Sequence, residues 1–254
     1  METDHSKMKL GKSTPVDDPK TLQLADYIDQ NVLPAAPAQY SYGGNISAWG
    51  MMVNDKINIC TCAAAGHLIM EWTNANGAMF TPADQDIIKA YAAISGYNPV
   101  SGTGDGGAGA KDALNYWRKT GIAGHQILAY AALTPQNHQQ IMQSVYLFGG
   151  CYVGLSLPLS AQNQAVWAIP PAGTQTNSTK GSWGGHVVPV IGYSADDLTV
   201  VTWGITKTMT WDFWNAYCDE SYAIISADFA ANNTAPNGFK LASLKQDLQK
   251  ITNG

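Results

Sequence analysis

Hydrophobic and polar positions along the chain predict helices in its first half and strands in its second. Helical spacing marks four segments, at 60–74, 81–94, 108–119 and from 134 to about 147. Short apolar runs mark four strands, at 151–156, 186–193, 198–203 and 221–226. Asp196-Asp197 fits a hairpin turn between two of these strands, and Thr81 fits the N-cap of the second helix. Helices followed by strands predict an α+β fold.

The two ends of the chain differ in character from this central part. Residues 1–45 begin with a polar stretch, so we expect a partly flexible N-terminal extension with a short helix within 18–31. Near the other end, apolar residues recur at three- and four-residue spacing and predict an amphipathic helix within 236–254: Leu241, Leu244, Leu248 and Ile251. We expect this helix to dock on the body of the protein, with pairing to another chain as the alternative, and the sequence leaves the oligomeric state open.

Composition narrows the classes of partner and the compartment. Charged residues make up 13% of the chain and the net charge is −5, which argues against nucleic acid and against an anionic membrane surface. No apolar run approaches the roughly 18–20 residues of a transmembrane helix, and no signal-peptide core is present. The four cysteines show no disulfide-scaffold spacing, so a reducing cytoplasm is the expected location.

Three residues carry the candidate chemistry. Cys60 begins an apolar, alanine-rich segment, and a thiol at a helix start lies near the positive end of the helix dipole, which favours the thiolate. His186 begins a strongly apolar strand, where folding could bring it to the thiol as a base. Asn54, six residues before Cys60, could donate an N–H to an oxyanion. Together they supply a nucleophile, a base and an oxyanion donor.

Five motifs follow one another in a recognisable order between about Trp49 and Trp203. They are Asn54-DKINI-Cys60, the helix start FTPADQDII, the loop and helix GDGGAGAKDALNYWRKTGI, the segment TPQNHQQIMQSVYLFGGCYVGLSL, and His186 to Tyr193 followed by a strand that ends in Trp203-Gly204. This order resembles that of the papain-like cysteine proteases.

The resemblance implies an α+β fold of two lobes, in which a helical lobe with the nucleophile helix faces an antiparallel β-barrel-like lobe. Residues 46–235 would form the catalytic domain, with the helical lobe at about 55–130 and the β lobe at about 131–235. Its site would have Cys60, His186 and Asn54 as catalytic residues. Four further residues would bind substrate: Asp105, Gly106, Gly107 and Trp203. Of these, Asp105 has the alternative of capping the next helix.

The sequence also departs from the family pattern. The family's asparagine, two positions before the tryptophan, aligns with Val201, which cannot accept a hydrogen bond from the histidine. The oxyanion glutamine is the shorter Asn54. Ile57 and Gly104 stand where the family has a disulfide, so that bridge cannot form. Only about 45 residues precede the matching region, so the family's long prosegment is also missing.

Two alternatives concern the histidine and cysteines near the nucleophile. Cys62 has Lys56 rather than an amide six residues upstream and lies farther from the helix start, so Cys60 is the expected nucleophile and Cys62 a buried apolar residue. A metal site of Cys60, Cys62 and His67 lacks the paired spacing of common zinc sites and a fourth ligand, so neither a metal nor a cofactor is expected. His67 is expected to be a packed core histidine.

The sequence thus favours a cysteine hydrolase that cleaves a peptide or amide bond through an acyl-thioester on Cys60, with His186 as base. Acyl transfer to an amine by the same thioester is one alternative. A non-catalytic binding protein with a papain-like fold is the other, and the valine at position 201 favours it.

Overall fold

A computed structural model describes residues 4–16, 21–24, 34–230 and 234–238 of the chain. The amphipathic helix expected within 236–254 and most of the short helix expected within 18–31 lie outside these residues. None of the helices in the described ranges is long and apolar enough to cross a membrane.

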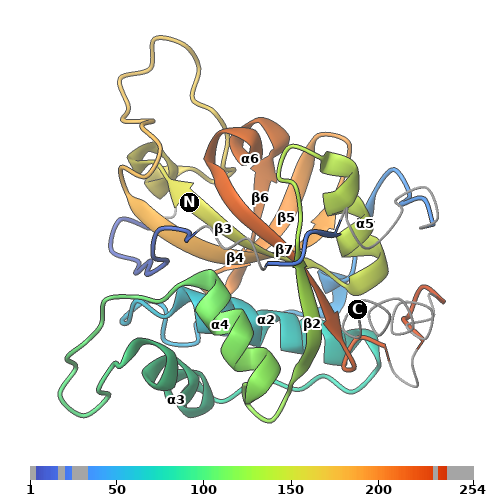
Figure 1. Cartoon of the computed structure of the whole chain (residues 1–254). Helices are drawn as coiled ribbons and strands as arrows, with labels where there is room; N and C mark the ends of the chain where they lie inside the picture. The colour runs from blue at the N-terminus through green and yellow to red at the C-terminus, as the bar shows by residue number, and fades with distance from the viewer. Residues whose placement is uncertain (1–3, 17–20, 25–33, 231–233, 239–254) are drawn as a thin grey trace.

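A seven-stranded antiparallel sheet forms one layer of the molecule (Figure 1). Its order is β2-β7-β3-β4-β5-β6, and β1 pairs with β4 off this path. The strands are β1 (Tyr40–Ser41), β2 (Ile127–Ala132), β3 (Cys151–Leu157), β4 (Gly184–Tyr193), β5 (Asp197–Thr202), β6 (Ile205–Thr210) and β7 (Cys218–Ser226). The central strands β3, β4 and β7 are buried along most of their length, which accounts for the apolar runs that predict them at 151–156, 186–193 and 221–226.

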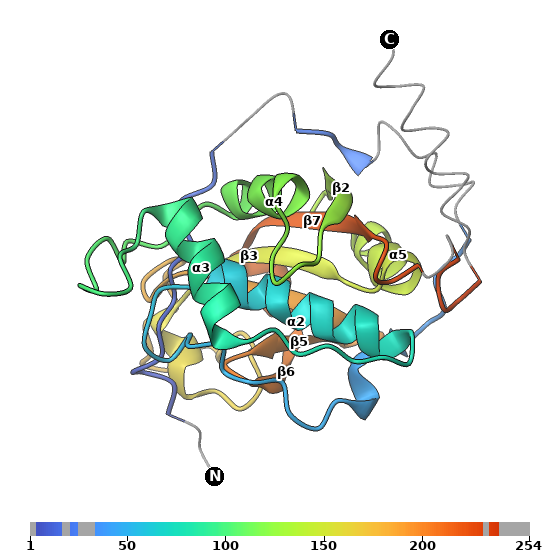
Figure 2. The same ribbon diagram turned by 90° about the horizontal axis from the view of Figure 1, so that it is seen from below.

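Helices α2, α3 and α4 lie together on one side of this sheet (Figures 1 and 2). The helices are α2 (Cys60–Ala75), α3 (Asp84–Ser95), α4 (Ala110–Lys119), α5 (His138–Phe148) and α6 (Trp211–Tyr217), with short 3-10 turns at Gly43–Asn45 and Leu159–Asn163. The arrangement is an α+β fold of a helical lobe and a β lobe, as predicted.

Helix α2 is buried from Cys60 to Thr73 and packs against β4. Gly66 allows α2 to approach two other segments closely: a Cβ at Gly66 would lie 2.4 Å from the sulfur of Met52 and 2.9 Å from Ile87 of α3. The nucleophile candidate therefore begins a helix that is fixed on all sides by the core.

Several boundaries differ from the predictions. Helix α3 begins at Asp84 with Ala83 as its N-cap, so Thr81 does not cap it. Helix α5 begins at His138, where the side chain of Asn137 accepts a hydrogen bond from the backbone N–H of Gln140. Strand β2, helix α6 and strand β6 were not predicted. Because β2 belongs to the sheet, the lobe boundary expected near residue 130 falls inside a strand.

Candidate active site

Cys60 is the first residue of α2, and Ile59 precedes it as the N-cap without a side-chain hydrogen bond. The first N–H groups of a helix have no partner within the helix, so they can favour negative charge on a nearby atom. Backbone N–H groups of Val187, Thr61 and Cys60 itself act on the sulfur in this way. Because Val187 adjoins His186, the thiol lies beside the strand that carries the candidate base.

His186 is buried, and its Nε2 atom lies 2.8 Å from the hydroxyl oxygen of Thr202. Its Nδ1 atom has no hydrogen-bond partner among the described residues. The register brings the two residues together, since Val190 pairs with Val200 and the end of β5 reaches the start of β4. Side chains alternate along a strand, so Val201 points away from the face that Thr202 presents. Val201 cannot accept a hydrogen bond from the histidine, as the sequence indicates, and the neighbouring Thr202 supplies the hydrogen-bond partner of the ring.

Trp203 covers the same histidine. The two rings are stacked with centroids 4.7 Å apart. Trp203 and Gly204 are the central residues of a two-residue turn between β5 and β6, and both have positive φ, at 46° and 77°. A turn of this kind fits the twist of a hairpin, but positive φ is unfavourable for tryptophan. Backbone strain is thus retained where it places the indole against His186.

Asn54 lies in a loop whose backbone is also strained. Met52 and Val53 have φ of 48° and 62°, which is rare for a β-branched residue such as valine. The Asn54 side chain is buried, and its Nδ2 atom donates to the carbonyl oxygens of Lys9 and Ile57, each at 3.3 Å. The amide that the sequence predicts as an oxyanion donor is therefore bound to a carbonyl group from the start of the chain.

The loop that contains Asp105, Gly106 and Gly107 contacts the segment before Cys60 and the start of the chain. The carboxylate of Asp105 accepts hydrogen bonds from the backbone N–H of Asn58, at 2.9 Å, and from the Tyr91 hydroxyl, at 2.8 Å. Asp105 thus ties the loop to the segment before Cys60, and it does not cap α4, whose N-cap is Gly109. A Cβ at Gly107 would overlap the carbonyl oxygen of Gly11, whereas one at Gly106 would meet open space.

Residues 5–13, here called the N-terminal strap, cross the site between the two lobes. In Figure 1 this dark blue segment lies at the level between the sheet and the helices below it. On the helical side, Ala108 donates its N–H to Gly11 O at 2.8 Å and accepts the N–H of Ser13 at 3.1 Å, in a parallel bridge. On the sheet side, the N–H groups of Gly11 and Lys12 donate to Gly185 O at 3.1 and 2.9 Å.

The strap also occupies the groups expected to act on a substrate. The Lys9 carbonyl oxygen accepts from Asn54 Nδ2 and, at 3.1 Å, from the indole N–H of Trp203. His5, expected in a flexible tail, is buried with its ring stacked on Trp203 at 5.0 Å. A Cβ at Gly11 would overlap the carbonyl group of Asn58, two residues before Cys60. The strap therefore fits closely over the nucleophile end of α2.

Burial determines the protonation of Cys60 and His186. It raises the pKa of Cys60 to about 12, although Val187, Lys12 and the first N–H groups of α2 favour the thiolate. Burial also lowers the pKa of His186 to about 3. The sequence-based expectation of a low-pKa thiolate is wrong for this covered state, because loss of water disfavours both charged forms. Near neutral pH the covered pair is a thiol and a neutral imidazole.

The competing residues have structural roles. Cys62 lies two residues after Cys60 in α2 and is fully buried, and this burial raises its pKa to about 12. His67 is buried, and its Nε2 atom lies 3.0 Å from the carbonyl oxygen of Gly50, which confirms the interpretation as a core histidine. All four cysteines are free and buried. Within the described ranges, no three His, Cys, Asp or Glu side chains gather in a group that could hold a metal ion.

Sequence reasoning missed Thr202 and the strap. The sequence did contain a signal for Thr202, because a residue with a hydroxyl group stands directly before Trp203-Gly204. This position is the end of a strand, and the end of that strand lies next to the start of the strand that carries His186. For the strap the signal was weaker. Gly11 within a polar stretch permits close backbone approach, but many surface loops share that feature.

The sequence matches no protein-family model and no curated protein, whereas the fold matches many solved structures. Xylellain, a cysteine protease from Xylella fastidiosa, is 16% identical over 87% of this chain and 97% of its own, with a TM-score of 0.66. Digestive procathepsin L 3 of Tenebrio molitor is 12% identical over 88% of this chain and 77% of its own, with a TM-score of 0.58. The Carica candamarcensis cysteine protease CMS1MS2, solved with E-64, is 12% identical over 75% of this chain and 99% of its own, with a TM-score of 0.53.

These similarities establish a papain-like two-lobe fold, as the order of motifs predicted. The structural neighbours are cysteine proteases. At these identities the similarity concerns the fold, so the chemistry of this chain rests on its own residues.

Proposed function

We propose that this protein is a cysteine hydrolase that cleaves a peptide or amide bond through an acyl-thioester on Cys60. The observation that carries the proposal is the Thr202–His186 hydrogen bond, which fixes the imidazole at Nε2 and leaves Nδ1 free of hydrogen bonds among the described residues. In the tautomer that carries its proton on Nε2, Nδ1 is the basic atom of His186. The next residue in the strand is Val187, and its backbone N–H acts on the Cys60 sulfur.

Each step then has a named group. His186 accepts the Cys60 proton, and the sulfur attacks the substrate carbonyl carbon. The backbone N–H of Cys60 and the side chain of Asn54 stabilise the oxyanion. His186 protonates the leaving amine, and then removes a proton from the water that hydrolyses the thioester. Thr202 orients the ring throughout, and Trp203 keeps water from its face.

The strap must leave before a substrate can bind, because Lys9 holds Asn54 and Trp203, and Gly11 lies against the segment before Cys60. Gly11→Ala introduces a Cβ that overlaps Asn58 and is strained at the φ of 118°. Gly102→Ala is the matched control, since Gly102 also has positive φ, at 72°, but faces open space.

The test measures cleavage of a broad fluorogenic peptide pool by full-length Gly11→Ala, with Gly102→Ala and Gly11→Ala/Cys60→Ala in parallel. We expect Gly11→Ala to cleave, Gly102→Ala to behave as the unchanged protein, and removal of Cys60 to abolish cleavage. Adding a free amine and analysing products by mass separates hydrolysis from acyl transfer. Cleavage that survives Cys60→Ala contradicts the proposal. So does a lack of cleavage by unlabelled Gly11→Ala when a separate sample of this variant shows that iodoacetamide reaches Cys60.

A further inference from the structure

Lys12 of the strap inserts its side chain into a buried acidic pocket. The side chain is 1% exposed, and Nζ lies 3.1 Å from Oδ2 of Asp219 and 3.4 Å from Oε1 of Glu220. It also donates to Ser13 O at 3.2 Å. Burying an ammonium group costs free energy unless the group is paired, and the two carboxylates of the pocket provide this pairing.

The walls of the pocket leave room for a long aliphatic chain. A Cβ at Gly154 would lie 2.8 Å from Cδ of Lys12 and 2.6 Å from Cγ of Glu220, and a Cβ at Gly185 would overlap the Lys12 backbone. The absence of side chains on β3 and β4 at these two positions therefore forms the passage from the site to the carboxylates.

The acidic pair is held in place independently of Lys12. Ser156 donates its hydroxyl to Asp219 Oδ2 at 2.7 Å, and Tyr222 donates to Glu220 Oε2 at 2.8 Å. Glu220 is only 8% exposed, and its Oε1 atom and Oδ1 of Asp219 accept no hydrogen bond within the described part of the chain. Lys12 is the cation of both ion pairs that the described residues form here, so departure of the strap would leave the two carboxylates without this partner.

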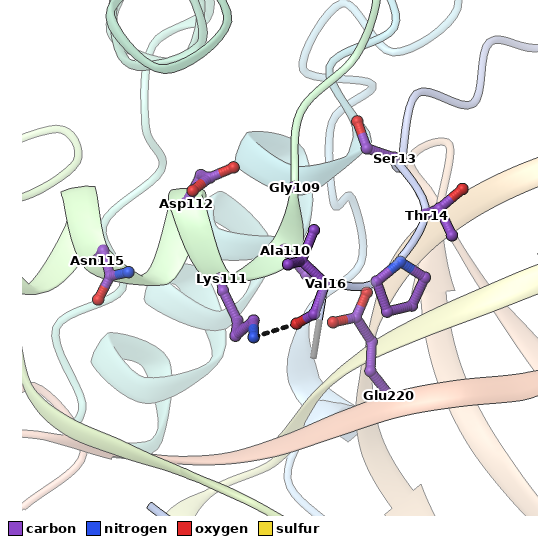
Figure 3. A pocket seen from close by; sticks show the side chains of 10 residues that line it. Ser13, Thr14, Val16, Gly109, Ala110, Lys111, Asp112, Asn115 and Glu220 are labelled. Atoms are coloured by element: carbon purple, nitrogen blue, oxygen red, sulfur yellow. Dashed lines mark hydrogen bonds between the residues drawn. The ribbon is translucent and has the colours of Figure 1, made fainter. Parts of the chain in front are cut away.

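Additional space adjoins Glu220. A cavity of about 400 Å³ lies where the strap leaves the site, and Glu220 forms part of its wall beside Pro15 and Val16 (Figure 3). The start of α4 forms the opposite wall, where Lys111 donates to Val16 O. The pocket can therefore take a side chain longer than lysine.

We propose that Asp219 and Glu220 form the specificity pocket of this site and select substrates that carry a lysine or arginine side chain. In the covered state, Lys12 occupies the pocket in place of the substrate side chain. The assignment of the pocket to a substrate rests on the proposed hydrolase function, whereas its preference for a cationic side chain can be measured by binding alone.

Binding is tested with full-length Gly11→Ala/Cys60→Ala and a fluorescent peptide that reproduces residues 8–15. Versions of the peptide carry lysine, arginine, norleucine or glutamine at the position of Lys12. We expect the lysine and arginine peptides to bind at least about tenfold more tightly than the other two, and Glu220→Gln or Asp219→Asn to remove that difference. Asp112→Asn, an exposed carboxylate on the cavity wall, is the matched control and should keep it.

Catalysis is tested with Gly11→Ala and four substrates that differ only in carrying lysine, arginine, norleucine or glutamine at one position. A preference of at least about tenfold in kcat/KM for lysine and arginine, lost in Glu220→Gln, supports the pocket. Equal cleavage of all four substrates overturns it and leaves the hydrolase proposal intact. Selective binding without any Cys60-dependent cleavage keeps the cation preference and contradicts the hydrolase. If Glu220→Gln does not fold, the peptide series still decides, because it needs no change in the pocket.

Discussion

The hydroxyl oxygen of Thr202 lies 2.8 Å from Nε2 of His186, at the point where the ends of two neighbouring strands meet. In the proposed mechanism, this hydroxyl group orients the imidazole ring. In the tautomer that carries the proton at Nε2, the hydroxyl oxygen accepts a hydrogen bond from that N–H and Nδ1 is the basic atom.

Replacing Thr202 tests this relationship. In the Gly11→Ala background, we expect Thr202→Val to lower kcat about 10–100-fold with little change in KM, because a ring without its partner adopts the wrong tautomer or rotamer. Thr202→Ser keeps the hydroxyl and should restore most of the rate. A pH profile of kcat that is identical in Thr202→Val and Thr202→Ser would show that the hydroxyl does not act on the histidine.

Displacing the strap should expose one thiol selectively. All four cysteines are buried, so iodoacetamide should label the unchanged protein slowly. We expect Gly11→Ala to raise the labelling rate of Cys60 at least about tenfold at pH 8, which corresponds to ~1.4 kcal/mol, while the other three cysteines stay slow. Peptide mapping measures each rate, and Gly102→Ala provides the control. Faster labelling of all four would indicate general unfolding instead.

Glu71 should make the protein less stable as the pH rises. Its carboxyl group is fully buried in α2, accepts no hydrogen bond among the described residues, and burial raises its pKa well above the usual value. The folded state therefore keeps a proton that the unfolded state loses. Stability falls as the pH rises above about 4.5, by up to ~1.4 kcal/mol per pH unit, until the folded carboxyl group ionises.

Glu71→Gln removes this group with little change of shape. We expect the variant to unfold at higher urea concentration than the unchanged protein at pH 8, and the difference to shrink toward pH 4.5. Glu71→Gln that is equally or less stable at pH 8 would mean that the carboxylate has a compensating partner.

His67 and His186 should cause the opposite dependence in acid. Burial lowers their pKa values to about 4 and about 3, from 6.5. Because the unfolded chain binds these protons first, stability is complete above pH 6.5 and is lost as the pH falls toward the folded pKa values. Urea unfolding at pH 7 and pH 5 measures the loss, which is ~1.4 kcal/mol per pH unit for each histidine. His67→Gln should reduce it, whereas the same change at the less buried His138 should not.

The sequence predicted the nucleophile helix and the strand that carries His186 because their patterns are local. Fourteen residues at the start of α2 are buried, and their small and apolar side chains show this directly. The partner of His186 depended on register instead. Alignment by distance from Trp203 selected Val201, whereas strand alternation selects the neighbouring Thr202.

The position of the strap could not be predicted in this way. Its polar sequence resembles a solvated tail, and its contacts are mostly backbone hydrogen bonds to residues far along the chain, such as Ala108 and Gly185. Such contacts leave little pattern in the sequence, because almost any residue can make them. Lys12 is the exception, but an acidic pocket for it becomes visible only when β7 and the strap are placed side by side.

Burial of Cys60 beneath the strap also bears on chemical durability. Peroxide attacks a thiolate and converts it stepwise to sulfenic and then irreversibly to sulfinic acid. With its pKa raised to about 12 and water excluded, the covered sulfur is a poor target. The covered state therefore protects the Cys60 sulfur from oxidants, and under the proposed function this protection ends when the strap leaves.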